Sequence, residues 1–326
     1  MLKKVLITGG YGFIGSNLAQ KCVELGMEVT IIDNLDTGSG GNIFNVQNIK
    51  DKIEIVNGDI TDIDVLAGVI KNKDFIFNCA ASTSHTLSMK QPLLNLQNNC
   101  KAVINILELI KNLSLKSKLI HLSTTTQLGK LIFKPADENH PEFPTDIYSA
   151  NKMASEKYVL LYSRSFDIKA IVFRLCNVYG PRAAIHSPNF TFNNYFIGQA
   201  LQNKSITVFK PGNQIRNSIY IDDVIEAIIK GANSNLSSDI FQIVNDEHFT
   251  VKEIAEMTIE VLGGKLDLID WPENNLKIEI GDALLSNEKA KKYLNWFPKV
   301  TIKEGLNLTK AYYIKHLSNY LSFKCD

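Results

Sequence analysis

The chain has 326 residues, of which 45% are hydrophobic, with 35 basic against 34 acidic side chains. This length supports one large core or a core with a smaller lobe, which is the size range of α/β enzymes. A net charge near +1 provides no broad basic field for nucleic acid or an anionic membrane surface, so neither is expected as a partner.

Up to about residue 180, short β-branched runs alternate with longer helical stretches, which is typical of a parallel sheet with helices on both faces. Most predicted strands are continuous apolar runs, as expected where both faces are covered. The strands span 3–8, 28–33, 53–57, 74–79, 117–123 and 169–176. The helices between them span 13–26, 62–71, 92–112 and 146–166. The pattern predicts an α/β fold with a doubly wound parallel sheet in residues 1–180.

Beyond Pro181 the order of elements changes, and we expect a smaller lobe over residues 181–326 that interleaves with the first domain. Some of its segments are expected to return to that domain. Its predicted elements are helices at 190–203, from Asp222, at 250–262 and at 286–294, strands at 206–209 and 240–244, and a turn at 211–213.

The cysteines are odd in number, scattered and without CxxC spacing: Cys22, Cys79, Cys100, Cys176 and Cys325. This pattern favours a reducing compartment and no metal site. No charged and apolar leader follows Met1, and no apolar stretch approaches the ~20 residues that span a bilayer. We therefore expect a cytoplasmic protein.

A glycine-rich turn follows the first strand, where Gly10, Gly12 and Gly15 fit the G-x-G-x-x-G spacing and open a helix. In dinucleotide-binding proteins such glycines allow a tight turn and close approach of the backbone to the pyrophosphate, which faces the helix amino terminus. Glycine turns also close ordinary loops, so the motif alone leaves both interpretations open.

Polar and small residues follow the next strands. Asp33 ends the second strand, where a carboxylate can accept hydrogen bonds from both ribose hydroxyls and repel a 2′-phosphate. This favours NAD over NADP, although an ordinary turn aspartate is the alternative. Asp59 follows the third strand and could accept from the adenine amino group. Ala80 and Ala81 follow the fourth and could let the cofactor pass close to the backbone.

Tyr148 and Lys152 lie four residues apart in a predicted helix and so share a face. The ammonium of Lys152 can then lie near the phenol and favour its phenolate, which would act as the base in oxidation of an alcohol. The fifth strand ends in four hydroxyl residues, 123–126, and a hydroxyl beside Tyr148 would orient the substrate alcohol. The sequence therefore predicts an alcohol-oxidising enzyme.

In this order, these segments resemble the extended short-chain dehydrogenases/reductases of the nucleotide-sugar epimerase and dehydratase family, of the UDP-glucose 4-epimerase type. The resemblance covers nearly the whole chain. Matching segments are 8–15, 33–35, 58–60, 80–81, 99, 123–124, 148–152, 174–182, 212–216 and 220–224. It implies a Rossmann-type sheet with a carboxy-terminal substrate lobe, NAD as cofactor and a nucleotide-diphosphate sugar as substrate.

The resemblance also implies roles for single residues. Thr124, Tyr148 and Lys152 would form the catalytic set. The implied cofactor contacts are Gly9, Gly12, Phe13, Ile14, Gly15, Asp33, Asn34, Asp59, Ile60, Ala80, Ala81, Asn99, Tyr148 and Lys152. The expected substrate contacts are Thr125, Thr126, His85, Asn177 and Arg216.

Two of these substrate contacts have ordinary alternatives. The planar fork of Arg216 suits a diphosphate, but a surface arginine is the alternative. His85 lies in the loop after the fourth strand, near the expected sugar pocket. A loop histidine of this kind is otherwise simply solvated.

The chain departs from the family pattern in several places. Dehydratases of the family commonly carry Asp and Glu after the catalytic threonine, where this chain has Thr125 and Thr126. Neutral hydroxyls cannot readily remove the C5 proton and expel the C6 hydroxyl. Gln127-Leu128 replaces the usual Val-Tyr, which predicts an unusual sugar pocket. Lys210 and Ser286 stand where glycine and aspartate are common, which puts the nucleotide contacts in doubt.

The reaction expected is oxidation at C4 of a nucleotide-linked sugar, with Tyr148 taking the hydroxyl proton, and 4-epimerisation is its most economical outcome. A net 4-dehydrogenase is the close alternative. A 4,6-dehydratase and a non-catalytic NAD-binding regulator are further ones, and the intact set of Thr124, Tyr148 and Lys152 argues against the regulator.

A homodimer is also expected, through the helices at 92–112 and 146–166. These helices carry apolar residues on more than one face, and contact with the sheet would bury only one of these faces. The residues are Val103, Ile104, Ile106, Leu107, Leu109, Ile110, Met153, Val159, Leu160 and Leu161.

Overall fold

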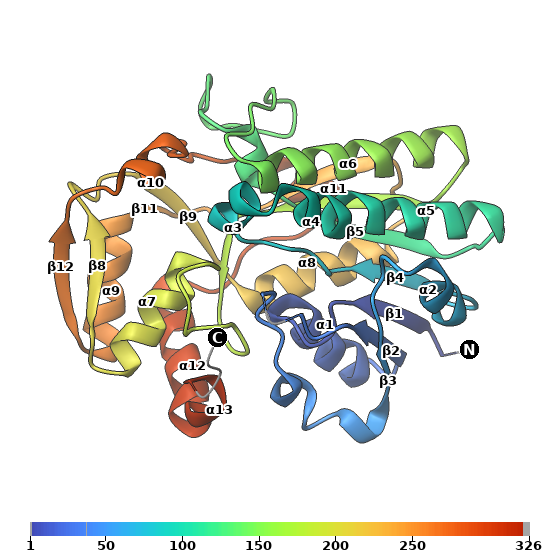
Figure 1. Cartoon of the computed structure of the whole chain (residues 1–326), viewed down its shortest axis with the longest axis horizontal. Coiled ribbons are helices and arrows are strands. Elements are labelled where there is room, and N and C mark those ends of the chain that lie inside the picture. Colours follow the sequence, from blue (N-terminus) through green and yellow to red (C-terminus); the bar gives the residue numbers. More distant parts are fainter. Residues whose placement is uncertain (1, 37, 322–326) are drawn as a thin grey trace.

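A seven-stranded parallel sheet forms the centre of the molecule (Figure 1), in a computed structural model that describes residues 2–36 and 38–321. Its strands, in spatial order, are β10 (Asp239–Ile243), β6 (Ala170–Leu175), β5 (Lys118–Thr124), β4 (Phe75–Asn78), β1 (Lys4–Thr8), β2 (Glu28–Asp33) and β3 (Ile53–Asn57). The predicted α/β class with a doubly wound parallel sheet is confirmed.

The chain reverses its winding direction at β1, which pairs with β2 on one side and with β4 on the other. Thr8, the last residue of β1, is in register with both Ile32 and Asn78. In open sheets the strands' carboxyl ends leave a crevice at such a reversal, and ligands bind there.

Helices cover both faces of the sheet because successive side chains of each strand point to opposite sides. Val5 and Ile7 of β1 pack into the core with α1 (Phe13–Glu24) and α8 (Ile221–Asn233). Leu6 packs into a second core on the other face, shared with α2 (Ile63–Val69), α5 (Ala102–Asn112) and α6 (Ile147–Ser165). Figure 1 shows α5 and α6 side by side over that face.

The carboxy-terminal half supplies both main-sheet elements and a smaller lobe. β10 and α8 belong to the main sheet and its cover, together with α11 (Glu288–Leu294). The lobe holds a three-stranded sheet, β11 (His248–Thr250), β9 (Ile215–Tyr220) and β7 (Asn177–Tyr179), and a two-stranded one, β12 (Lys265–Ile269) and β8 (Ser205–Phe209). Its helices are α7 (Phe192–Leu201), α9 (Val251–Leu262), α10 (Glu273–Lys277), α12 (Ile302–His316) and α13 (Ser318–Leu321).

One predicted element is wrong in form. The stretch expected as a single helix at 92–112 is α4 (Pro92–Leu96), a π-helical turn η3 (Gln97–Lys101) and α5, preceded by the short α3 (His85–Lys90). The π turn contains Asn98 and Asn99, whose side chains bond a loop of the crevice. Such turns widen a helix locally and often occur at functional sites. Short 3₁₀ turns complete the chain: η1 (Ile43–Val46), η2 (Lys50–Lys52) and η4 (Thr125–Leu128).

The other predicted elements agree with the structure to within two residues at each end. Cys22, Cys79, Cys100 and Cys176 are free thiols, whereas Cys325 lies outside the described residues. Over residues 2–36 and 38–321, no helix has the length and apolar content needed to cross a membrane.

Candidate active site

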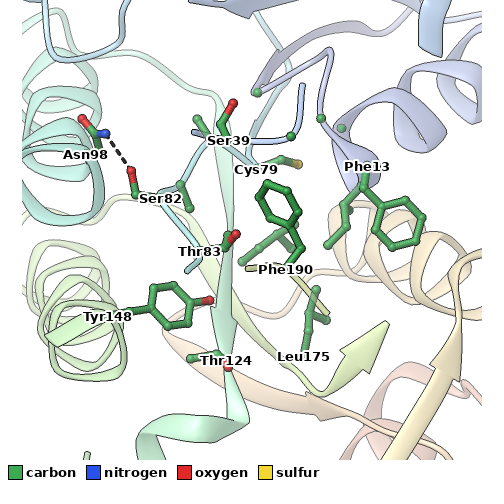
Figure 2. A pocket seen from close by; sticks show the side chains of 18 of the residues that line it. Phe13, Ser39, Cys79, Ser82, Thr83, Asn98, Thr124, Tyr148, Leu175 and Phe190 are labelled. Atoms are coloured by element: carbon green, nitrogen blue, oxygen red, sulfur yellow. Dashed lines mark hydrogen bonds between the residues drawn. The ribbon is translucent and has the colours of Figure 1, made fainter. Parts of the chain in front are cut away.

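A hollow opens at the carboxyl ends of β1, β2, β4, β5 and β6, and it collects most of the predicted site residues. Those that line it are Gly9, Gly12, Phe13, Ile14, Gly15, Asp33, Asn34, Asp59, Ile60, Ala80, Ala81, His85, Thr124, Thr125, Thr126, Tyr148, Lys152 and Asn177. Asn99 and Arg216 are not among its lining residues. Figure 2 shows part of it, with Phe13 and Tyr148 on opposite sides.

The glycine turn leaves no room for side chains. Gly9 has φ +70°, and a Cβ there would lie 2.8 Å from the backbone of Ala80. A Cβ at Gly15 would lie 2.1 Å from the carbonyl oxygen of Gly9. Gly12 precedes α1 without a side-chain cap, so the first N–H groups of this helix face the hollow and suit an anion such as a pyrophosphate.

Asp33 is held at the end of β2 with only 8% of its surface exposed. One carboxylate oxygen accepts the Tyr11 N–H at 3.0 Å, and the other accepts the Leu35 N–H at 2.8 Å. Burial raises the pKa of Asp33, although the two backbone hydrogen bonds oppose this change. Each oxygen keeps a further lone pair, so the carboxylate can accept two ribose hydroxyls.

Beyond Asp33 the hollow continues past the end of β3. Asn34 Nδ2 donates to Asp59 Oδ2 at 3.0 Å, and the Thr61 N–H donates to Oδ1 at 2.7 Å. Burial disfavours the Asp59 carboxylate, but these bonds and the charge of Lys101 outweigh it, and its pKa is lowered. Asp59 is therefore an ionised acceptor, suited to an amino group.

At the other end of the hollow, α6 packs against the end of β5. Tyr148 and Lys152 lie on one buried face of α6, and the Tyr148 hydroxyl points toward Thr124 across the hollow (Figure 2). The helix begins beneath the tyrosine, where the N-cap Asp146 accepts the Ser149 N–H at 2.8 Å. The Tyr148 N–H donates to Ser88 Oγ at 3.0 Å. These bonds hold the backbone at the start of α6, which carries the Tyr148 side chain.

The protein's own side chains keep this phenol protonated. Burial and the charge of Asp146 raise the pKa of Tyr148, against a smaller lowering by its hydrogen bond with Thr124. Burial lowers the pKa of Lys152 to about 8, and its ammonium donates to the carbonyl of Leu122. In the protein without ligand the pKa of the phenol is thus raised, and the expected effect of Lys152 on the phenolate stays a prediction.

The two threonines after Thr124 are hydrogen-bonded hydroxyls. Thr126 Oγ1 lies 3.0 Å from Thr124 Oγ1 and 2.9 Å from Ser149 Oγ. Thr125 Oγ1 donates to the Leu175 carbonyl at 3.4 Å. In the lining of this end of the hollow, within the described residues, no carboxylate takes their place.

Asn99 acts behind the hollow. It is 1% exposed, and its Nδ2 donates to the Ser82 carbonyl at 3.0 Å, as that of Asn95 does at 3.1 Å. Asn98 Nδ2 donates to Ser82 Oγ at 2.7 Å (Figure 2). Three asparagines thus fix Ser82, a lining residue that the sequence analysis did not select. The cluster Asn95, Asn98 and Asn99 was the available signal.

Arg216 lies in the second lobe on β9, where the protein itself occupies its fork. One terminal nitrogen donates to Glu279 at 2.7 Å, and the other donates to the carbonyls of Ile215 and Gly281 at 3.0 and 2.6 Å. Its side chain is 13% exposed. A diphosphate could use this guanidinium only in place of Glu279 or beside it.

Two departures from the family pattern lie away from the hollow. Gln127 is fully buried, accepting from Ser123 Oγ at 2.9 Å and donating to Glu156 at 2.9 Å. Glu156 also forms an ion pair with the buried Arg174, in which Arg174 Nη2 lies 2.6 Å from Glu156 Oε1. Gln127 thus joins β5 to α6 behind the hollow and does not line it, and the expectation of an unusual sugar pocket stays a prediction. Lys210 is exposed and paired with Asp270.

Comparison with known proteins gives consistent matches. A model of the NAD dependent epimerase/dehydratase family matches residues 5–245. The chain is 32% identical over 304 residues to a putative UDP-glucose 4-epimerase of Methanocaldococcus jannaschii, covering 93% of this chain and 95% of that protein. It is 29% identical over 324 residues to UDP-glucuronic acid decarboxylase 1 of Xenopus tropicalis, covering 97% of this chain and 73% of that protein.

A solved structure is similar over almost its full length. The UDP-glucose 4-epimerase of Thermotoga maritima, determined with UDP-glucose, superposes with a TM-score of 0.88 at 27% identity, covering 96% of this chain and 99% of that one.

Proposed function

The chain belongs to the NAD dependent epimerase/dehydratase family and is an NAD-dependent enzyme, and from this premise we propose that it is a 4-epimerase of a nucleotide-diphosphate sugar. The observation that carries the proposal is the meeting of Tyr148, Lys152 and Thr124 in the same hollow as the glycine turn and Asp33. The relatives named UDP-glucose 4-epimerase support UDP as the nucleotide.

The residues of the hollow fit NAD. A side chain at Gly9 or Gly15 would fill the turn, and the amino terminus of α1 suits the pyrophosphate. Asp33 would hold the adenosine ribose, and Lys152 the nicotinamide ribose. When bound, NAD supplies a hydride acceptor and, in the reverse step, a hydride donor, and its oxidised ring carries the positive charge that the phenol requires.

Tyr148 would take the proton of the 4-hydroxyl. Thr124 lies opposite and would hydrogen-bond the same oxygen, which orients the alcohol for proton removal. Lys152 contributes its charge at neutral pH because its pKa of about 8 keeps the ammonium mostly protonated there. The 4-keto sugar would then present its other face, and Tyr148 would return the proton to the new alcohol.

Dehydration is not expected. It needs a base for the C5 proton and an acid that assists departure of the C6 hydroxyl. Thr125 and Thr126 are neutral and bonded to neighbouring groups. Asp33, Asp36 and Asp59 line the adenosine end of the hollow, away from the sugar that Tyr148 would contact.

The test combines the purified protein, NAD and a panel of nucleotide sugars with mass and absorbance measurements. A new C4 epimer of unchanged mass, without accumulated NADH, is the expected result. Loss of two hydrogens with NADH would instead show a net 4-dehydrogenase, loss of water a dehydratase, and loss of carbon dioxide a decarboxylase. Tyr148→Phe should lower the rate by about 10² to 10⁴ and leave NAD binding largely intact.

A further inference from the structure

His85 lies at the catalytic end of the hollow without a part in the C4 oxidation. It is the first residue of α3, it lines the hollow, and its side chain is 38% exposed. Its ring meets that of Tyr148 edge to face, with centroids 5.0 Å apart and an interplanar angle of 85°. The imidazole therefore borders the part of the hollow in which Tyr148 would contact the sugar.

A buried carboxylate fixes the orientation of this imidazole. Nδ1 lies 2.7 Å from Asp146 Oδ2, and the Asp146 side chain is 3% exposed. Burial opposes ionisation of Asp146, but the hydrogen bond and the charge of His85, together with hydrogen bonds from Ser149, outweigh it, so that the pKa of Asp146 is lowered. An ionised carboxylate accepts, and therefore Nδ1 carries the proton and donates it.

This assignment leaves Nε2 as the basic atom. Across residues 2–36 and 38–321, no protein group forms a hydrogen bond with His85 Nε2. A carboxylate that holds Nδ1–H and leaves Nε2 free is the arrangement by which imidazole acts as a general base in hydrolases.

We propose that His85 Nε2 removes and returns the proton on a carbon adjacent to the C4 carbonyl, C3 or C5, while the sugar is oxidised. This inference rests on the proposed C4 oxidation. The C–H electron pair forms a carbon–carbon double bond, the charge passes to O4, and the proton goes to Nε2. Return of a proton from Nε2 to the same carbon restores the ketone, so no oxidant or further reactant is needed.

The neighbouring residues support the charge that this step creates. After C4 oxidation Tyr148 carries the sugar's proton, and its raised pKa keeps the proton there. The phenol and the Thr124 hydroxyl can therefore both donate to O4, as donors in an oxyanion site do. The enzyme would thus exchange a carbon-bound proton with water without expelling the C6 hydroxyl.

Incubation in D₂O tests the proposal, because hydride transfer leaves the hydrogen at C4 unexchanged with water. The wild-type enzyme with NAD and an accepted nucleotide sugar should incorporate deuterium at C3 or C5, counted by mass and located by NMR. The measured quantity is the deuteration rate divided by the C4 conversion rate in the same tube.

Substitutions identify the base. His85→Asn keeps an amide N–H that can donate to Asp146 but has no basic nitrogen, and the ratio should fall at least about tenfold. His85→Gln should do the same. His316→Gln, on α12 away from the hollow, should leave the ratio unchanged. In ¹⁵N NMR the His85 signals, identified by their loss in His85→Asn, should show the Nδ1–H tautomer.

Each contrary outcome has one meaning. C4 conversion without deuterium in the wild type, an unchanged ratio in His85→Asn, or the Nε2–H tautomer would overturn the role of His85 and leave the proposed function standing. Absence of any C4 conversion would overturn the proposed function and this inference with it.

Discussion

At the residue scale, the burial of the Lys152 ammonium in the candidate site opposes the stability of the fold. Its side chain is buried to 3% exposure in α6, where a charge is poorly solvated. The fall of its pKa from 10.5 to about 8 corresponds to about 3 kcal/mol against the charged form. An apolar residue of similar shape would avoid this cost, so the lysine is kept for its charge and its hydrogen bonds.

We predict that Lys152→Met abolishes hydride transfer and raises the free energy of unfolding at pH 7 by about 1 to 3 kcal/mol. The folded wild type loses this proton near pH 8 and the unfolded chain near 10.5. Stability of the wild type therefore rises between these values, and the advantage of the variant should disappear by pH 10.5. Urea unfolding at several pH values measures both effects.

Lys4→Met, which removes an exposed lysine on β1, is the control and should change stability by less than about 0.5 kcal/mol. A Lys152→Met protein less stable than the wild type at pH 7 would contradict the argument.

Asp33 should determine the choice between NAD and NADP. Its carboxylate is fixed by the backbone of Tyr11 and Leu35, so it cannot move away from a 2′-phosphate, and it should repel that group. NAD should therefore bind far better than NADP, and Asp33→Ala should narrow the difference by weakening NAD and relieving NADP. Glu28→Ala, at the other end of the same strand, is the matched control. Equal affinity of the wild type for both cofactors, measured by calorimetry, would refute this assignment.

At the scale of elements, the main sheet could be predicted because its strands are buried on both faces and read as apolar runs. β9 could not, since its sequence Ile-Arg-Asn-Ser-Ile-Tyr mixes polar and apolar residues, and β7 and β11 have three residues each. The π-helical turn η3 could not be predicted, because the sequence of this segment continues the helical pattern of its neighbours. The N-cap Asp146, two residues before Tyr148, follows a recognisable capping pattern.

In the candidate site, too, some residues could be predicted from the sequence and others could not. Residues at strand ends were predictable because parallel strands end at one edge of the sheet. The pairing of Arg216 with Glu279 was not, because these residues are far apart in sequence and meet only through the folding of the second lobe. The same holds for His85 and Asp146, which α3 and the start of α6 bring together.

Glu279, in the segment after α10, should limit the binding of the nucleotide. It occupies the fork of Arg216 at 2.7 Å and also accepts the Gly281 N–H at 2.9 Å. If Arg216 binds the diphosphate, a carboxylate beside it repels the ligand and competes for the same donor. Glu279→Gln removes the charge and keeps an acceptor.

We predict that Glu279→Gln lowers the Kd of the nucleotide sugar by about 3- to 10-fold, with a larger effect at low salt. Glu273→Gln, on the exposed surface of α10, should have little effect. Weaker binding by Glu279→Gln in calorimetry would mean that the ion pair positions Arg216 for the ligand instead of blocking it.

At the scale of the whole molecule, the expected homodimer stays a prediction, and the structure indicates which apolar residues of the expected helices are free to form it. Most apolar residues chosen for the interface are buried within the monomer: Val103, Ile106, Leu107, Leu109, Ile110, Val159 and Leu160. They pack under α5 and α6 against the sheet. The exposed apolar side chains on these helices and on the neighbouring α3 include Met89, Leu93, Leu94, Leu96 and Leu161. Of these, Leu161 belongs to the set chosen from the sequence.

These side chains make one face available for a second copy. α3 and α4 both contact α6, and Figure 1 shows α3, α4, α5 and α6 along one side of the molecule. Leu93 is 74% exposed and Leu161 57%. Apolar groups gathered on adjacent helices at this exposure are typical of surfaces that associate, whereas single exposed apolar residues are common on monomers.

We therefore predict that light scattering at micromolar concentration shows a dimer for the wild type. The double variant Leu93→Asp, Leu161→Asp should be a monomer, because it would bury unpaired charges in an apolar interface. Ile314→Asp is the control, since Ile314 is 66% exposed but lies on α12 in the second lobe, and it should remain dimeric. A monomeric wild type would refute the dimer itself. A dimer that survives the double substitution would place the interface on another face, and the apolar residues of α4 and α6 would then need another explanation.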